Sequence, residues 1–148
     1  MPLYLIRDAA MADLAALERC YPGVDHAGRI RGADGRAVRY LVIESGGEVA
    51  GFGRLFLGAS LSGRAGLPFP RISNLNVRPD LRGRGLGSAL VREMERLARA
   101  AGHGVLHIGV SRENERALAL YRRLGYDPLA EQPEGTGTRV YLVKRLPS

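Results

Sequence analysis

Three glycines alternate with other residues between a strand pattern and a helix pattern, and this turn limits the choice of fold more than any other segment. The turn begins at Arg82 and contains Gly83, Gly85 and Gly87. Glycine has no side chain, so the backbone N–H groups of such a turn can come close to a ligand. The helix that follows adds unpaired N–H groups and a partial positive charge at its N-terminus. The segment therefore predicts a phosphate-binding site.

Two common phosphate-binding motifs do not fit this turn. A Walker A loop would continue with Gly-Lys-Ser/Thr, and no such tripeptide follows. In the dinucleotide-binding fingerprint the third glycine stands one residue later than Gly87, and an acidic residue about 20 positions on holds a ribose. His103 and His107 occupy that neighbourhood instead. The elements before the turn are a hairpin and a strand, which also argues against a βαβ nucleotide fold.

Alternating apolar residues and turn signals divide the rest of the chain into short strands and helices. The strand patterns cover Leu3–Arg7, Val38–Ser45, Glu48–Leu57, Arg71–Val77, Val105–Val110 and Thr138–Leu146. Helix patterns follow the glycine turn and the capping residues Asp8 and Asn114. Residues 24–37 predict a short helix or a turn, and residues 58–70 have the composition of a loop.

Composition excludes several classes of protein. Hydrophobic residues make up 45% and charged residues 25% of the chain, as in soluble globular proteins. No apolar run approaches the roughly 20 residues of a membrane span, and Met1–Asp8 does not read as a signal peptide. Cys20 is the single cysteine and cannot form an internal disulfide. We therefore expect a cytoplasmic protein without a membrane partner.

The net charge of +7 comes almost entirely from arginine, because Lys144 is the only lysine. Such a charge is compatible with nucleic-acid binding, with an anionic cofactor, or with a biased composition and a solvated basic surface. The arginines are spread along the chain and do not form a basic stripe with interleaved aromatic residues. This distribution disfavours nucleic acid and favours a few arginines beside an anionic cofactor.

Several motifs in register resemble those of one family. The hexapeptide Arg82–Gly87 fits Arg/Gln-x-x-Gly-x-Gly/Ala, and residues 75–79 supply a preceding strand that ends in Val-x-Pro. Asn114 and Ala117 fit Asn-x-x-Ala, and residues 120–126 fit Leu-Tyr-x-x-Leu-Gly-Phe/Tyr. Together these motifs resemble the GNAT superfamily of N-acetyltransferases. The likeness spans nearly the whole chain and is weaker over residues 22–70.

The resemblance implies one acetyltransferase domain over residues 1–148 with an α/β fold. Its mixed, mostly antiparallel central sheet would splay open near residues 75–77, with helices on both faces. The implied reaction transfers the acetyl group of acetyl-CoA to a primary amine by direct attack in a ternary complex, without a metal. The partners would be acetyl-CoA and an amine acceptor, and the resemblance leaves open whether the chain forms a homodimer.

The resemblance also implies roles for individual residues. The pyrophosphate would lie on the N–H groups of Arg82, Gly83, Arg84, Gly85, Leu86, Gly87 and Ser88. The pantetheine arm would run along Leu75, Asn76 and Val77, pairing with the backbone of the first and the last, and Asn114 with Ala117 would complete its site. One backbone N–H would polarise the thioester carbonyl. Tyr121 would protonate the departing thiolate, although a packed aromatic residue on the helix would give the same pattern.

The proton acceptor is harder to assign. Many members of the family carry a glutamate on the strand before the turn, whereas Ile72–Val77 contains no carboxylate. His107 is the nearest alternative, but it alternates with apolar residues in a strand, which favours a structural role. His103 and His107 would lie about 13 Å apart along an extended chain, too far to share a metal ion. Our hypothesis is that no dedicated side chain accepts the proton.

The sequence leaves two alternatives to acetyl transfer open in the same site, and it does not identify the acceptor. The chain could use another acyl-CoA, or it could be a sensor or interaction domain that binds acyl-CoA without catalysis. We expect the acceptor to contact residues 22–37, the loop 58–70 and the tail 128–138. Their composition permits a small amine, an antibiotic, an amino acid or a peptide N-terminus.

Overall fold

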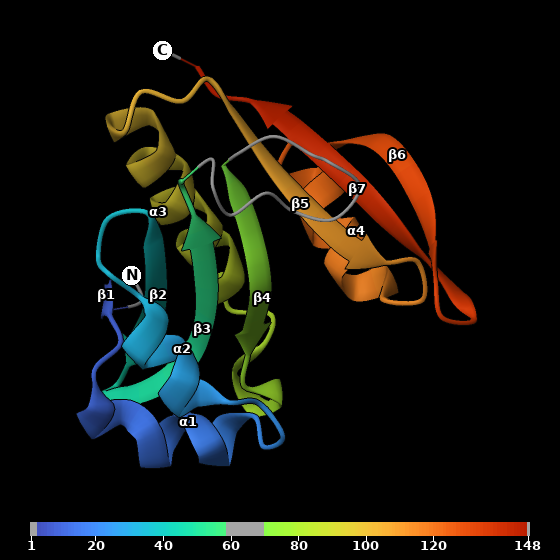
Figure 1. Ribbon diagram of the computed structural model, residues 1–148. Coiled ribbons are helices and arrows are strands. Elements are labelled where there is room, and N and C mark those ends of the chain that lie inside the picture. The colour runs from blue at the N-terminus through green and yellow to red at the C-terminus, as the bar shows by residue number, and fades with distance from the viewer. Residues whose placement is uncertain (1–2, 59–69, 148) are drawn as a thin grey trace.

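A seven-stranded sheet forms the centre of the computed structural model, which describes residues 3–58 and 70–147 (Figure 1). The strand order is β1-β2-β3-β4-β5-β7-β6, and only the β4–β5 pair is parallel. The mixed, mostly antiparallel sheet is therefore confirmed. The strands are β1 (Tyr4–Asp8), β2 (Val38–Ser45), β3 (Glu48–Phe56), β4 (Arg71–Val77), β5 (Val105–Ser111), β6 (Asp127–Glu134) and β7 (Gly137–Arg145).

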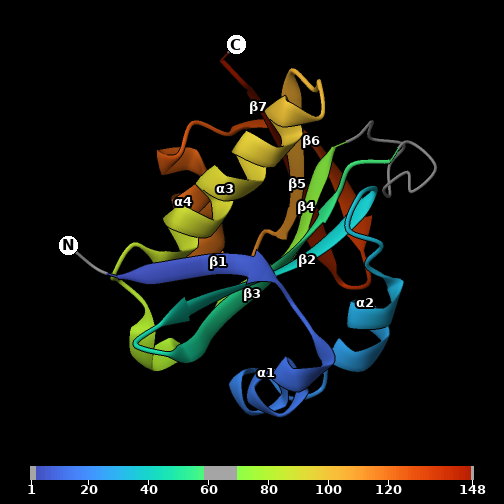
Figure 2. The ribbon, with the colours of Figure 1, turned by 90° about the vertical axis from the view of Figure 1, so that its left-hand side faces the viewer.

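Helices cover both faces of the sheet, as expected (Figure 2). One face carries α1 (Leu14–Cys20) and α2 (His26–Gly32), and the other carries α3 (Leu86–Ala100) and α4 (Glu115–Arg123). The predicted short helix within residues 24–37 is thus present as α2. Among the described residues no helix has both the length and the apolar character that crossing a membrane requires.

Strand β2 shows how the sequence builds a core on each face. Tyr40 and Val42 pack in the cluster under α1, whereas Leu41 and Ile43 pack in the larger cluster under α3. Side chains of a strand alternate between the two faces, so a strand that is covered on both sides reads as a continuous apolar run. All four residues are nearly inaccessible to solvent.

Strands β4 and β5 part almost as soon as they meet. They pair only through Arg71 with His107 and Ile72 with Ile108. Two residues further on, Asn74 has a left-handed backbone with φ of +56°, opposite a register shift between Phe52 and Arg54 of β3. Such a bulge bends a strand and increases its twist. The splay expected near residues 75–77 is therefore confirmed, and it begins at Ser73.

The first helix begins later than the sequence predicts. Asp8 does not cap it, because Asp8 ends β1 opposite Leu41 and binds the Arg39 guanidinium at 2.8 and 2.9 Å. A short 3-10 turn precedes α1, and there Asp13 accepts a 2.7 Å hydrogen bond from the Ala10 N–H. The strand ladder thus prevails over the local capping preference of Asp8.

Strand β6 corrects the expected tail 128–138. Residues 127–134 pair with β7 at the edge of the sheet, and residues 137 and 138 begin β7 itself. Nearly every side chain of β6 is exposed, so no apolar alternation marks it as a strand. Its two prolines, Pro128 and Pro133, are compatible with an edge position. The predicted loop 58–70 lies mostly outside the described residues.

We predict that Gly51→Ala destabilises the protein. An added Cβ at Gly51 would lie 2.6 Å from the Asn76 carbonyl oxygen, so the backbone of β4 must shift. Overpacking of this kind costs about 1–3 kcal/mol in the free energy of unfolding, measurable by urea denaturation. Gly32→Ala is the control, because its Cβ would meet nothing within 4 Å at the end of α2. Equal stabilities of the two variants would contradict this packing.

Candidate functional site

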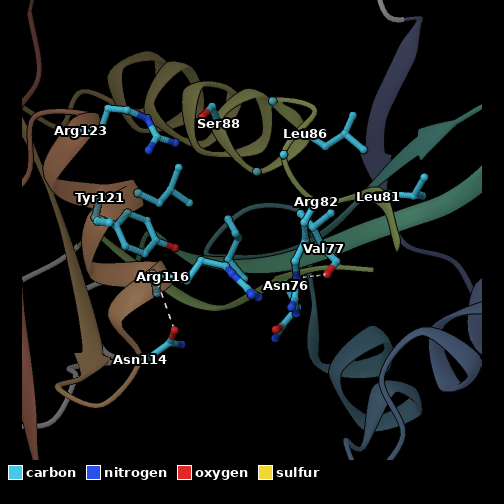
Figure 3. A pocket seen from close by; sticks show the side chains of 17 residues that line it. Asn76, Val77, Leu81, Arg82, Leu86, Ser88, Asn114, Arg116, Tyr121 and Arg123 are labelled. Atoms are coloured by element: carbon cyan, nitrogen blue, oxygen red, sulfur yellow. Dashed lines mark hydrogen bonds between the residues drawn. The ribbon is translucent and has the colours of Figure 1, made fainter. Parts of the chain in front are cut away.

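A cleft of about 460 Å³ opens where β4 leaves β5 (Figure 3). Its walls are β4, the glycine turn with the start of α3, and one face of α4. It brings together the residues predicted from the sequence: Leu75, Asn76, Val77, Arg82, Gly83, Gly85, Leu86, Gly87, Ser88, Asn114, Ala117 and Tyr121. Arg84 is an exception, because it is exposed and does not line the cleft.

The glycine turn presents the start of α3 to the cleft without a cap. Gly83 and Gly85 have φ of +80° and +84°, a left-handed conformation that favours glycine. Gly85 is the N-cap of α3 and has no side chain to bind the first helical N–H groups. The N–H groups of Leu86, Gly87 and Ser88 consequently remain available in the 15-residue helix. The turn is suited to an anion, as the sequence predicts.

The free edge of β4 offers backbone groups to the same cleft. The Arg78 N–H donates to the Ala50 carbonyl at 2.8 Å, and Val77 stands opposite Gly51 in the register. Hydrogen-bonded and non-hydrogen-bonded pairs alternate in an antiparallel ladder, so Val77 directs its N–H and C=O away from β3. The two-residue period gives Leu75 the same direction. Beyond Ile72, β5 no longer pairs with this edge.

Positive charge accumulates in the cleft. Arg82, Arg116 and Arg123 line it, whereas no carboxylate does among the described residues. The Arg82 Nε donates to the Val77 carbonyl oxygen at 3.1 Å, which ties the turn to the end of β4. The arrangement would stabilise a polyanion such as a pyrophosphate.

Sequence reasoning missed five lining residues, which lie on the turn before the glycines and on α4. Arg116, Leu120 and Arg123 follow the i, i+4, i+7 spacing of one helix face. Since Tyr121 of the same helix is predicted to line the site, this spacing is the signal that could have identified them. The complete set that was missed is Leu81, Arg116, Ala119, Leu120 and Arg123.

Asn114 lies at the N-terminus of α4 and caps it. Its side-chain oxygen accepts a 3.2 Å hydrogen bond from the Ala117 N–H. This bond uses the acceptor of the amide and leaves the Nδ2 donor for a ligand. The Asn-x-x-Ala spacing therefore has a local structural cause in the cap, and Asn114 still lines the cleft.

Tyr121 is both packed and directed at the cleft. Only 3% of its surface is accessible, and its ring makes an edge contact with Tyr126 at 5.7 Å between centroids. Its hydroxyl nevertheless points into the cleft (Figure 3). Burial raises the pKa of Tyr121 well above that of a free phenol. The hydroxyl is thus held as a proton donor rather than as a phenolate.

A buried polar cluster holds the Tyr126 ring, which contacts Tyr121. The Tyr126 hydroxyl donates to Glu95 at 2.8 Å, and Lys144 contacts the same carboxylate at 3.1 Å. Glu95 is only 5% exposed, so its charge is compensated by these two donors. The cluster orients Tyr126, whose ring makes the edge contact with Tyr121.

His107 does not belong to the cleft. It is 3% exposed within β5, and its Nδ1 lies 3.2 Å from the Pro70 carbonyl, to which it donates. The structural role favoured by the sequence therefore agrees with its position. In residues 3–58 and 70–147 no three His, Cys, Asp or Glu residues lie close enough together to hold a metal ion.

The chain is similar in sequence to known acetyltransferases. The model of the acetyltransferase (GNAT) family matches residues 7–126. N-alpha-acetyltransferase RimI from Mycobacterium tuberculosis is 38% identical over 88 residues, which make up 59% of this chain. The matched stretch covers 51% of RimI. The stretches matched in two other curated relatives cover 21% and 31% of those proteins. The chain thus spans about half or less of these relatives.

Solved structures share the fold over almost the whole chain. The ribosomal-protein-alanine N-acetyltransferase from Brucella melitensis is 26% identical, with a TM-score of 0.75 and coverage of 96% of this chain and 99% of that one. YncA from Salmonella typhimurium, whose structure includes acetyl-CoA, is 23% identical, with a TM-score of 0.77 and coverage of 98% and 95%.

Because burial raises the pKa of Tyr121, its phenol should not ionise in the native protein at the pH where a free phenol does. Between about pH 8 and pH 11, where a free phenol ionises, ultraviolet phenolate absorbance should change equally in the parent and in Tyr121→Phe. In urea the variant should lose the signal of one phenol. Since the unfolded chain releases this proton first, Tyr121 also lowers the parent's stability as pH rises above about 10. A native signal reduced by one phenol in the variant would contradict the burial.

Proposed function

This chain belongs to the acetyltransferase (GNAT) family, and we propose that it transfers the acetyl group of acetyl-CoA to a primary amine. The observation that carries this proposal is one cleft with three suitable parts. It combines an uncapped helix N-terminus, a free strand edge and a buried tyrosine hydroxyl. The acetyl-CoA in the structure of YncA and the N-acetyltransferase names of the relatives support the same assignment.

The residues of the cleft would hold the pyrophosphate and the pantetheine arm of acetyl-CoA. The N–H groups from Gly83 to Ser88 would hold the pyrophosphate, with charge from Arg82, Arg116 and Arg123. The Arg82 N–H already donates to the Pro79 carbonyl at 3.4 Å. The pantetheine arm would lie along β4 and pair with Leu75 and Val77 as an added strand does. The Val77 carbonyl already accepts from Arg82, so Val77 would contribute its N–H. The Asn114 amide would donate to the same arm.

Acetyl-CoA supplies an acetyl group that is activated as a thioester. A backbone N–H of β4 would polarise the thioester carbonyl. The neutral amine forms the new C–N bond as the C–S bond breaks, and Tyr121 donates a proton to the departing sulfur. The amine proton passes to water, since neither a carboxylate nor a histidine lines the cleft among the described residues. A proton from water then restores the Tyr121 hydroxyl.

Gly85→Glu should abolish binding of acetyl-CoA. The added carboxylate would project from a residue of the turn toward the pyrophosphate. The parent at 100 times the dissociation constant should gain about 2.7 kcal/mol, or a melting shift of about 5–10 °C. Gly102→Glu is the control, because it has a φ of +90°, equally open surroundings and a place at the other end of α3. A full melting shift in folded Gly85→Glu would place the site elsewhere.

Tyr121→Phe should lower turnover by about 10- to 1,000-fold, within the usual span of general acid catalysis. The substitution removes the proton donor and keeps the packed ring, so the melting shift with acetyl-CoA should persist. Release of free CoA thiol measures the rate. Equal turnover of variant and parent would reduce Tyr121 to a packing role. A melting shift without thiol release from any acceptor would favour a binding domain that lacks catalysis.

The described residues that line the cleft include no side-chain base, and this predicts the pH profile of kcat/KM. The limb that rises with pH should follow the pKa of the acceptor's amine, because the amine attacks only when it is neutral. Two acceptors whose amine pKa values differ by about 2 units should show limbs displaced by a similar amount. Limbs at one common pH for both acceptors would reveal an enzyme base.

A further inference from the structure

A second cavity, of about 170 Å³, lies directly beside the cleft on the opposite face of the sheet. Arg71, Ser73 and Asn74 of β4 form one side of it, and Gly109 of β5 and Arg139 and Tyr141 of β7 form the other. Ile108, Val140 and Leu142, which alternate with these residues along β5 and β7, pack under α3 on the other face. Ile72 belongs to that core cluster and also lines the cavity. The cavity ends at Asn74, and the cleft begins at Leu75.

Gly109 gives this cavity its shape. A Cβ at this position would lie 3.0 Å from the Tyr141 ring and 3.3 Å from the Arg139 Nε. Both side chains therefore occupy space that any other residue would need. Tyr141 is itself held in place, since it is 3% exposed and its hydroxyl donates to Gln132 at 3.2 Å. The guanidinium of Arg139 consequently lies across β5 at the cavity.

The cavity is strongly cationic. Arg71 and Arg139 line it, and no described lining residue is acidic. Arg54 stands opposite Ser73 in the register, so it lies on the same face of the sheet. Burial and the nearby Arg29 and Arg71 guanidinium groups lower the pKa of Arg54, and its buried Nε has no hydrogen-bond partner.

The Glu134 carboxylate contacts this group of arginines from the rim. The Nε of Arg139 lies 3.4 Å from Glu134, which is partly exposed. A guanidinium has five N–H donors in a planar fork, so this contact leaves donors for a ligand. Like charges on one face of a sheet repel each other, and a bound anion would relieve that repulsion.

We propose that this cavity binds a carboxylate of the acceptor, so that the acceptor is an amine with a carboxylate near its reacting nitrogen. The inference rests on the proposed function and adds the substrate class. The volume is below the roughly 300–1,000 Å³ of sites for whole drug-sized ligands, so the cavity holds the carboxylate and a few neighbouring atoms. Arg139 binds the carboxylate while the amine reaches the thioester through the opening between β4 and β5. A free amino acid and an acidic peptide both carry this chemistry.

The test compares acceptors that differ in the carboxylate, with kcat/KM expressed per neutral amine because the carboxylate also changes the pKa of the amine. α-Amino acids are paired with their carboxamides, and peptides with an acidic residue near the N-terminus are paired with their amidated counterparts. CoA thiol release should show kcat/KM higher for the carboxylate by about 10- to 100-fold, the range of a charge-assisted pair. Arg139→Gln should bring this ratio near unity. Arg145→Gln, also on β7 but outside the cavity, should preserve it.

A binding measurement separates this inference from the proposed function. N-acetyl amino acids and their amides are titrated calorimetrically into the protein saturated with CoA, which requires no turnover. Preference for the carboxylate that Arg139→Gln abolishes supports the cavity even if no acceptor is acetylated. If the parent acetylates or binds acid and amide equally well, the carboxylate site is wrong. This holds even if acetyl-CoA binding and acetyl transfer are both observed. The preferred member of the panel, amino acid or peptide, identifies the source of the carboxylate.

Discussion

Strands β4 and β5 share two residue pairs before they part, and both proposed ligand sites lie at that separation. Backbone groups at a sheet edge need a partner or water, so the open edge of β4 can pair with a ligand. The bulge at Asn74 begins the separation. A left-handed asparagine costs on the order of 1 kcal/mol, and packing of β3 and β4 against α3 offsets this cost.

Two different surfaces result from this one separation. On the α3 face the chain provides N–H groups, Arg82 and a buried tyrosine hydroxyl, which suit a phosphorylated thioester. On the opposite face it provides Arg71 and Arg139 around Gly109, which suit a carboxylate. Because consecutive residues of β4 line both, the two ligands would meet at the opening between β4 and β5, as direct transfer requires.

The sequence predicts the parts of the site that local rules determine. The glycine turn, the start of α3 and the Asn114 cap depend on neighbouring residues, and the structure has them as expected. Strand β6 could not be predicted because its exposed side chains carry no apolar period. The second cavity depends on register between β4, β5 and β7, which no local pattern encodes. Arg139 and Gly109 become neighbours only through that pairing.

Amide hydrogen exchange by NMR tests most directly whether the open edge of β4 receives acetyl-CoA. Adding acetyl-CoA should slow exchange at Leu75 and Val77 and at the first N–H groups of α3, because these would become hydrogen-bonded. Amides of β2, which are paired on both sides, serve as the internal reference. If acetyl-CoA binds while Leu75 and Val77 exchange as they do in the free protein, the edge of β4 is not the binding surface and the account is wrong.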